Sequence, residues 1–594
     1  MTSPIQEAQA WLDRFAAALV QRDAHAAAAL FVEHCYWRDL LTFTWNIKTL
    51  EGQAAVHDML EATLQHVQPS GWAITGEPTR DERGTEAWFQ LETAVARAEG
   101  VVRLIGGKCH TMFTAMKELK GHEEPRGPTR PAGTRHRADP NRVTWTDARR
   151  HEEETLGEAV QPYVVVVGGG QCGMALGARL KQLGVSTIIL DKNARPGDAW
   201  RQRYRTLVLH DPIWFDHLPY LPFPEHWPVF TPKDKLGDWM EMYAKVMELN
   251  YWTHATCTHA TYDEQAKEWT VEVDREGQKR VLKPKHLVFA TGNSGPPRMV
   301  QLPGQEDFKG QVLHSSQYSD GKQYQGKKVA VIGAGSSGHD VCVDLWESGA
   351  DVTMVQRHPT TVVRIDTLLK FGMQLYSEGA VAAGITADKA DMILASLPYR
   401  VLEQVLRQMT DQIRAHDADF YRRLEAAGFL LDFGEDDTGL TMKAFRTASG
   451  YYIDVGCSDL IINGDVRVKS GADIERLTAD GILFKDGTHL QADAIVACTG
   501  FKTMGDVIAR VVSDEVVQAL GPCSGLGSGV RGDPGPWAGE IRNMWKPTRQ
   551  EGLWIMSGNL AYSRFYSRFL ALQLKARKEG LPTPVYGEAD GVHA

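Results

Sequence analysis

The sequence lacks several features that would place it in a specialised class. It has no apolar run long enough to cross a bilayer and no leading basic-then-apolar segment, so we expect a cytoplasmic protein that needs no membrane. Its eight cysteines form no CxxC pair, which argues against a zinc cluster and against a vicinal redox disulfide. The formal net charge of -10 argues against nucleic acid as a partner. We therefore expect a globular protein with reduced cysteines and no metal site.

The length of 594 residues is enough for several domains. Residues 1–122 combine helical periodicity with alternating segments, which predicts an α+β unit. Residues 123–158 are rich in proline, glycine and charge and are expected to form a linker. From Pro162 onward, short valine and isoleucine runs alternate with glycine-rich turns and helical segments, which is typical of parallel βαβ units. Residues of about 381–430 read as a helical insertion.

Two glycine-rich loops share one design. In the first, Gly168, Gly170 and Gly173 follow the run "YVVVV", and in the second, three further glycines follow "KKVAVI". The spacing GxGxxG supplies a tight turn, a close approach of backbone to a pyrophosphate and close helix packing, while the helix N-terminus attracts the phosphate charge. One such match is weak evidence, but two with the same context predict two dinucleotide sites. The glycines of the second loop are Gly333, Gly335 and Gly338.

The two loops differ at the end of the following strand. Asp191 follows Gly168 by 23 positions, and Gln356 follows Gly333 by the same 23. A carboxylate accepts hydrogen bonds from ribose hydroxyls and repels a 2′-phosphate, whereas a neutral amide followed by Arg357 favours that phosphate. The first site is therefore expected to bind FAD and the second NADPH. Further residues expected at these sites are Gln171, Lys192, Ser336, Ser337 and His358.

Two later segments close these units. Thr291 and Gly292 end the apolar run in "HLVFATG", and Thr499 and Gly500 end the run in "AIVACTG". Small residues at a strand end let the backbone pass close to a bound cofactor. We therefore expect both pairs to contact cofactors.

The segment "FKGQVLHSSQYSD" carries a family fingerprint. Phe308, Gly310, His314 and Tyr318 match FxGxxxHxxxY, so the chain resembles the class B flavoprotein monooxygenases. Within that class it is more similar to the flavin-containing monooxygenases, including the plant indole-pyruvate enzymes, than to the Baeyer–Villiger type. The resemblance implies an α/β protein with two Rossmann-like domains of the glutathione-reductase-like fold. It implies FAD-binding parts at 159–322 and 506–594, with an NADPH-binding domain at 323–505 between them.

The resemblance also implies a reaction. NADPH would reduce FAD, O2 would form a C4a-(hydro)peroxyflavin, and one oxygen atom would enter a small organic substrate by N- or S-oxygenation or by oxidation of a carbonyl or 2-oxo acid. Gly197 and Trp200 would contact the flavin, and His210 would bond the nicotinamide or flavin. His314 is a second candidate for catalysis, although its fingerprint more naturally positions the segment that links the domains. The alternatives are an oxidase or reductase that produces H2O2, a Baeyer–Villiger enzyme, and a binding protein with degenerate flavin domains.

The N-terminal unit resembles the NTF2-like or SnoaL-like cone fold. His34, Asp39 and His57 suggest acid–base chemistry there, but solvated charged residues are the more common explanation. A binding or dimerising module is therefore expected, with a homodimer as the assembly it would support.

Overall fold

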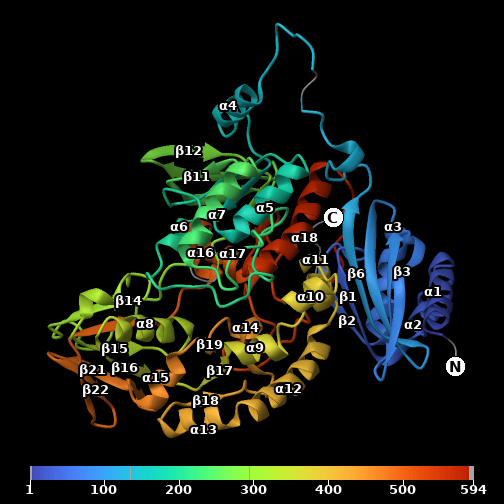
Figure 1. Cartoon of the computed structure of the whole chain (residues 1–594). Helices are drawn as coiled ribbons and strands as arrows, with labels where there is room; N and C mark the ends of the chain where they lie inside the picture. The colour runs from blue at the N-terminus through green and yellow to red at the C-terminus, as the bar shows by residue number, and fades with distance from the viewer. Residues whose placement is uncertain (1–2, 134–135, 293–294, 588–594) are drawn as a thin grey trace.

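The computed structural model describes residues 3–133, 136–292 and 295–587. Figure 1 shows a sheet-rich N-terminal unit beside a larger body that contains the two βαβ units. Parts of four expected segments lie outside the described residues: the start of the N-terminal unit, residues 134–135 of the linker, residues 293–294 after the first strand-closing pair, and the end of the C-terminal part. In the described chain, no helix combines the length and apolarity needed to span a membrane.

The N-terminal unit places three helices against one six-stranded sheet, whose strand order is β2-β1-β6-β5-β4-β3. Ser3 begins the first helix with a capping box shared with Gln6. Large aromatic side chains, including Trp11, Phe15 and Trp37, are fully buried between helices and sheet, so they fill this interior. The elements are α1 (Pro4–Val20), α2 (Ala24–Ala28), β1 (Phe31–Leu40), β2 (Ile47–Glu51), α3 (Gln53–Val67), β3 (Ser70–Asp81), β4 (Gly84–Glu92), β5 (Ala96–Ile105) and β6 (Lys108–Leu119).

The expected linker contains regular structure. It holds a short 3-10 turn, η1 (Gly127–Thr129), and a helix, α4 (Trp145–Thr155). Thr144 and Asp147 form a capping box at the start of α4. Glu152 of this helix accepts from the Lys181 ammonium at 2.9 Å, so the end of the linker is fastened to the first nucleotide-binding unit.

The first nucleotide-binding unit is built on a parallel sheet with the strand order β25-β13-β7-β8-β9. The four valines of β7 are all buried, as expected for a parallel sheet that other elements cover on both faces. A three-stranded antiparallel sheet, β10-β11-β12, is attached to it. The elements are β7 (Val164–Val167), α5 (Gln171–Gln182), β8 (Thr187–Leu190), α6 (Asp198–Arg201), α7 (Lys233–Val246), β9 (Tyr251–Trp252), β10 (Ala255–Asp263), β11 (Glu268–Arg275), β12 (Gln278–Leu282), β13 (His286–Phe289), α16 (Met504–Val511), α17 (Asp514–Leu520), β25 (Leu553–Ile555) and α18 (Leu560–Lys578).

The second unit repeats the design with the parallel order β14-β24-β15-β16-β20. Strand β14 belongs to this sheet although it precedes residue 323, so the second unit begins earlier than expected. Its pairing with β24, far along the chain, is not visible in local sequence. The elements are β14 (Gln311–His314), η2 (Gly321–Tyr324), β15 (Lys328–Ile332), α8 (Ser336–Glu347), β16 (Asp351–Gln356), β17 (Thr360–Arg364), β18 (Leu431–Asp432), α14 (Gly439–Thr447), β19 (Tyr451–Asp454), α15 (Cys457–Asn463), β20 (Val466–Ser470), β21 (Ile474–Thr478), β22 (Gly481–Phe484), β23 (His489–Gln491) and β24 (Ala494–Ala497).

A run of helices interrupts the second unit in the region where a helical insertion was expected. Figure 1 shows its long helices along the lower edge of the molecule and its short helices, α10 and α11, beside the N-terminal unit. Amphipathic patterning explains the longest helix, which buries Leu406 and Ile413 and leaves its opposite face exposed. The elements are α9 (Ile365–Phe371), α10 (Glu378–Ala382), α11 (Ala387–Ala395), α12 (Tyr399–His416) and α13 (Ala418–Ala426).

A buried ion pair joins the N-terminal unit to the larger body. Arg38 on β1 is 3 % exposed, and its Nε donates to Oε1 of Glu540 at 2.7 Å. The same guanidinium donates to the carbonyl of Ala395 at 2.6 Å and to the hydroxyl of Tyr566 at 3.0 Å. Apolar residues of the N-terminal sheet, such as Phe113, share one hydrophobic core with the first nucleotide-binding unit. The N-terminal unit is therefore packed as part of the larger body.

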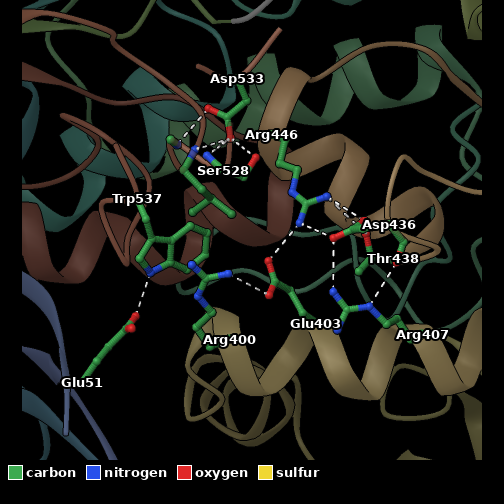
Figure 2. A network of polar contacts seen from close by, with 12 residues as sticks. Glu51, Arg400, Glu403, Arg407, Asp436, Thr438, Arg446, Ser528, Asp533 and Trp537 are labelled. Carbon is green, nitrogen blue, oxygen red and sulfur yellow. Dashed lines mark hydrogen bonds and ion pairs between the residues drawn. The ribbon is translucent and has the colours of Figure 1, made fainter. Parts of the chain in front are cut away.

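A second polar network, drawn in Figure 2, continues this joint toward the helical insertion. Trp537 donates to Glu51 of the N-terminal unit at 2.7 Å, and the Arg400 guanidinium lies 3.8 Å from the centre of the Trp537 ring. Arg400 pairs with Glu403, which in turn accepts from the buried Arg446 at 2.9 Å. Charged groups with several partners of this kind fix the geometry of the segments that carry them.

Removing one side of the buried pair is expected to be costly. Arg38→Met should lower the free energy of unfolding by about 3–5 kcal/mol, because it leaves the Glu540 carboxylate buried without its guanidinium. The double variant Arg38→Met/Glu540→Leu should recover most of that loss, and denaturant titration measures both. Arg83→Met in the same unit removes an exposed pair with Asp81 and should change stability by less than about 1 kcal/mol. A double variant no more stable than Arg38→Met would contradict this account.

Candidate functional site

The first glycine loop joins β7 to α5. Gly168 has a φ of +112°, and a Cβ there would lie 2.5 Å from the carbonyl oxygen of Ala290. A Cβ on Gly173 would lie 2.0 Å from the carbonyl oxygen of Gly168. At Gly170, by contrast, no atom lies within 4 Å of the Cβ position. The first and third glycines are thus required by packing, while the second leaves open surface at the N-terminus of α5.

Asp191 lies beside this loop. It is 8 % exposed, and its carboxylate accepts from the backbone N–H of Gly169 at 2.9 Å and of Asn193 at 2.8 Å. The Tyr251 hydroxyl donates to the carbonyl of Gly169 at 2.9 Å, which fixes the loop from its other side. Each carboxylate oxygen retains a second lone pair, so Asp191 can still accept from ribose hydroxyls. Lys192, next in the chain, is exposed.

A second helix N-terminus meets the first loop. Asn559 caps α18 by accepting from the backbone N–H of Tyr562 at 2.9 Å. Gln171, the first residue of α5, donates from Nε2 to the carbonyl of Gly558 at 3.1 Å. The positive ends of two helix dipoles therefore flank one surface. The α18 terminus was not expected as part of the site, although Asn559 before a helical stretch is a recognisable capping signal.

The second glycine loop repeats the geometry of the first. Gly333 has a φ of +119°, and its Cβ would lie 2.4 Å from the carbonyl oxygen of Cys498. A Cβ on Gly338 would lie 2.0 Å from the carbonyl oxygen of Gly333, whereas only the carbonyl oxygen of Tyr451, at 3.9 Å, approaches Gly335. Ser336 opens α8 and donates to that same carbonyl at 3.2 Å, and Ser337 follows it half-buried.

Gln356 does not take the position that the sequence suggested. Its side chain is fully buried, with Nε2 donating to the carbonyl of Leu430 at 2.8 Å and Oε1 accepting from the N–H of the same residue. It therefore stabilises the backbone of the insertion and does not face a ribose. Arg357 is exposed, and the next residue, His358, lies against the guanidinium of Arg531 with Nη2 and Nε2 2.9 Å apart. Burial and these two arginines lower the pKa of His358.

The strand-closing residues and His314 form one hinge region. His314 is 1 % exposed, and its ring contacts the carbonyl of Gly500 at 2.9 Å and the hydroxyl of Ser316 at 2.9 Å. Since both ring nitrogens are engaged, these contacts favour the positioning role, and a catalytic role for His314 stays a prediction. Thr499 donates to the carbonyl of Arg298 at 2.9 Å, and Thr291, followed by Gly292, points its hydroxyl at the sulfur of Met504.

Comparisons with known proteins agree with this arrangement. Residues 165–393 match the family model described as pyridine nucleotide-disulphide oxidoreductase. The chain is 32% identical to "Indole-3-pyruvate monooxygenase YUCCA1" of Oryza sativa subsp. japonica over 343 residues, which cover 58% of this chain and 77% of that protein. It is 29% identical to "Indole-3-pyruvate monooxygenase YUCCA6" of Arabidopsis thaliana over 351 residues, covering 57% of this chain and 76% of that protein. The chain belongs to the class B flavoprotein monooxygenases.

The fold agrees with that membership. An open crystal structure of cyclohexanone monooxygenase aligns with a TM-score of 0.51 and 18% identity, over 70% of this chain and 88% of that one. This likeness concerns the fold alone. The expected pair of Rossmann-like domains in this monooxygenase is confirmed, whereas the NTF2-like assignment of the N-terminal unit stays a prediction.

The flavin-side residues expected from the monooxygenase fingerprint lie at the start of α6. Gly197 has a φ of +87°, and its Cβ would lie 2.2 Å from the carbonyl oxygen of Gly237 in α7. Glycine at this position is thus required by the contact between two helices. Trp200 is half-buried and packs against the main hydrophobic core.

His210 of the monooxygenase lies between the two nucleotide-binding units. It is half-buried, and its charge acts on Asp211 beside it and on Asp340 in the first turns of α8. Asp211 in turn acts on Tyr451, next to the second glycine loop, and on Tyr562, in the first turn of α18. His210 is thus linked through Asp211 and Asp340 to residues beside both loops, and its catalytic role stays a prediction.

Two buried carboxyl groups belong to the segment that follows His210. Asp216 is 2 % exposed, and its buried Oδ2 has no hydrogen-bond partner within the described chain. Burial, together with the neighbouring Asp211, raises the pKa of Asp216 well above its usual range. Burial also raises the pKa of Asp211, and His210 opposes that shift. The nearest cation, Arg564, is already bound to both oxygens of Asp391 at 2.9 and 2.8 Å. Over the described residues, no group of three metal-ligating side chains is found.

The two open glycines give a matched pair of variants. Gly170 and Gly335 have φ values of -73° and -91°, which alanine adopts without strain, so Gly170→Ala and Gly335→Ala should both fold. Gly170→Ala should weaken FAD binding at least tenfold, about 1.4 kcal/mol, because its methyl group occupies the pyrophosphate surface. Gly335→Ala should retain flavin and weaken NADPH binding instead. Flavin absorbance after gel filtration and nucleotide titration measure the two effects, and loss of both cofactors in either variant would contradict separate sites.

Proposed function

We propose that the chain is an NADPH- and FAD-dependent monooxygenase that transfers one oxygen atom of O2 to a small organic substrate. The observation that carries this proposal is the pair of glycine loops with matching geometry in a chain of this family, one beside an acidic strand end and one beside exposed cationic residues. The residues present fit both cofactors, because Gly170 and Gly335 leave open surface where a pyrophosphate must approach backbone.

Each cofactor would be held by a defined set of groups. The N-termini of α5 and α18 would bind the FAD pyrophosphate, and Asp191 would accept from its ribose. The N-terminus of α8 would bind the NADPH pyrophosphate, and Arg357 would contact the 2′-phosphate. When bound, these cofactors supply the reducing equivalents and the activation of O2, so the protein needs neither a nucleophile nor a catalytic triad.

His210 would orient the reacting groups. It lies between the loops, where its ring can hydrogen-bond a nicotinamide amide or a polar atom of the flavin. The surrounding buried tyrosines and carboxylates exclude water, which favours oxygen transfer over release of peroxide.

Charge near His210 does not decide the substrate. The relatives are named for indole-3-pyruvate, which carries a carboxylate. Burial raises the pKa of Asp211 and of Asp216, which favours their uncharged forms, and these do not repel an anion. We therefore infer that a 2-oxo acid and an amine are both candidate substrates.

The N-terminal unit would support the enzyme without chemistry of its own. We keep the NTF2-like assignment as part of this proposal, because three helices against one six-stranded sheet suit it. Asp39 is fully buried and accepts from the N–H and hydroxyl of Thr44, and the exposed His57 pairs with its neighbour Asp58. These contacts are structural. A cytoplasmic location and a homodimer also stay predictions.

The proposed reaction is tested by measuring NADPH oxidation and the incorporation of oxygen from O2 in the same assay. The purified protein should be yellow, oxidise NADPH and place one atom of 18O2 in the product, as measured by mass spectrometry with tryptamine, indole-3-acetamide and indole-3-pyruvate as matched substrates. His210→Ala should retain flavin but release a larger share of the NADPH electrons as H2O2. NADPH oxidation that yields only H2O2 with every substrate would favour the oxidase alternative. A colourless protein that stays colourless with added FAD would exclude the enzyme.

Arg357 tests the choice of nicotinamide donor. Arg357→Ser should weaken NADPH binding by about 1.5–3 kcal/mol, roughly ten- to a hundredfold, because a charge-assisted contact to the 2′-phosphate is lost. NADH binding should be nearly unchanged, since it lacks that phosphate. Titration of the oxidised enzyme with both nucleotides measures the difference, and equal losses would refute the assignment. Arg510→Ser, an exposed arginine on α16, is the matched control.

A further inference from the structure

A cavity of about 340 Å³ lies where three parts of the molecule meet. Strands β5 and β6 of the N-terminal unit, helices α5 and α18 of the first nucleotide-binding unit, and α11 of the insertion form its walls, and Figure 1 shows these elements side by side. Its lining includes neither glycine loop. The cavity is therefore separate from the proposed oxygenation site, although it touches the two helices that begin at the first loop.

One wall of this junction cavity presents guanidinium groups with unsatisfied donors, although Arg179 also interacts with the Tyr220 hydroxyl. Arg568 on α18 forms no hydrogen bond within the described chain, and its nearest carboxylate oxygen, Oε1 of Glu99, is 3.8 Å away. Arg179 in the last turn of α5 is 9 % exposed, and its buried Nε has no partner among the described residues. Its Nη1 is 3.7 Å from Glu124, beyond hydrogen-bond distance. Desolvated guanidinium donors of this kind require acceptors.

Carboxylates also line the junction cavity. The side chains of Glu99 on β5 and Asp388 on α11 form no hydrogen bond within the described part of the chain, although Glu99 is ion-paired with Arg568 and both carboxylates act on its charge. The acids at the rim are different, because Glu118 and Glu123 both accept from Arg97, at 3.0 and 2.8 Å. Opposite charges thus lie close enough to compensate one another but too far apart to bond. A ligand with both hydrogen-bond donors and acceptors would supply the missing partners of these charged groups.

The remaining lining is mixed, with an apolar and aromatic surface beside Lys117, His122, Glu124 and Arg126. Trp88 of β4 lies beneath the ammonium of Lys389, and Met392 of α11 and Leu572 of α18 complete the wall. This surface can pack an apolar side chain of moderate size. A simple oxyanion would use the guanidinium groups but would leave the apolar wall empty and would face Glu99 and Asp388.

We propose that the junction cavity binds a free α-amino acid with an apolar side chain. Its carboxylate would lie between Arg179 and Arg568, its ammonium would face Glu99 and Asp388, and its side chain would contact Trp88. Such a ligand would connect the N-terminal unit to α5 and α18, whose first turns flank the FAD loop. The site is thus an effector site, independent of the substrate that is oxygenated.

Three related ligands test the carboxylate contact and the ammonium contact one at a time. Calorimetric titration of the enzyme saturated with FAD and NADP⁺ would use L-phenylalanine, its amide and its N-acetyl derivative. Arg568→Gln should weaken binding of phenylalanine and of the N-acetyl derivative about tenfold, because both carry the carboxylate, and should leave the amide unchanged. Glu99→Gln should weaken phenylalanine and the amide, which carry the ammonium, and should leave the N-acetyl derivative unchanged.

Matched controls keep this proposal falsifiable. Arg510→Gln, an exposed arginine outside the cavity, should bind phenylalanine as the natural sequence does. Flavin content and thermal unfolding check that Arg568→Gln folds, and Glu99→Gln tests the same cavity from another unit of the structure. Absence of phenylalanine binding, or equal affinity in Arg568→Gln and Arg510→Gln, would overturn the proposal. So would binding of inorganic phosphate that depends on Arg568 while phenylalanine does not bind.

Discussion

The position of α18 is the constraint on which the rest of the structure depends. Its N-terminus meets the first glycine loop through the hydrogen bond from Gln171 to Gly558. Its following turns contact the insertion and the N-terminal unit. Arg564 binds Asp391 of the insertion, and Tyr566 accepts from Arg38 of the N-terminal unit. A helix buried on nearly all sides cannot shift without moving each of these partners. The flavin end of the site therefore takes its geometry from segments far from the flavin.

The duplicated loops show which features a nucleotide site requires and which it can vary. In both units, a Cβ on the first or third glycine would approach backbone oxygen to 2.5 Å or less, whereas the second glycine faces open surface. That constraint is local, and the sequence predicts it correctly in both cases. The strand that follows is free to differ. Asp191 stays at its loop, while Gln356 is turned into the insertion and only the following Arg357 and His358 are exposed.

Sequence reasoning succeeded where short-range rules decide the structure and failed where distant segments meet. The glycine loops, the parallel sheets and the helical insertion follow from spacing and periodicity. The hydrogen-bond partner of His314 does not, because Gly500 lies 186 positions further along the chain. The sequence of α18 was equally uninformative, since Arg564, Arg568 and Gln573 suggest a solvated helix. Two of these polar residues have specific partners that periodicity does not reveal: Arg564 binds Asp391 of the insertion, and Gln573 donates to the carbonyl of Trp545.

The N-terminal unit also depends on partners from distant segments of the chain. Taken alone, its charged residues suggested a second active site, but its interior is filled by aromatic rings, and Asp39 is bonded to backbone. Its functional surface is instead the outer face of the sheet, where Arg38 reaches Ala395 and Tyr566. Because a buried guanidinium is tolerated only with its full set of acceptors, this face is complete only when the insertion and α18 are in place. The same requirement couples the folding of the unit to the assembly of the flavin site.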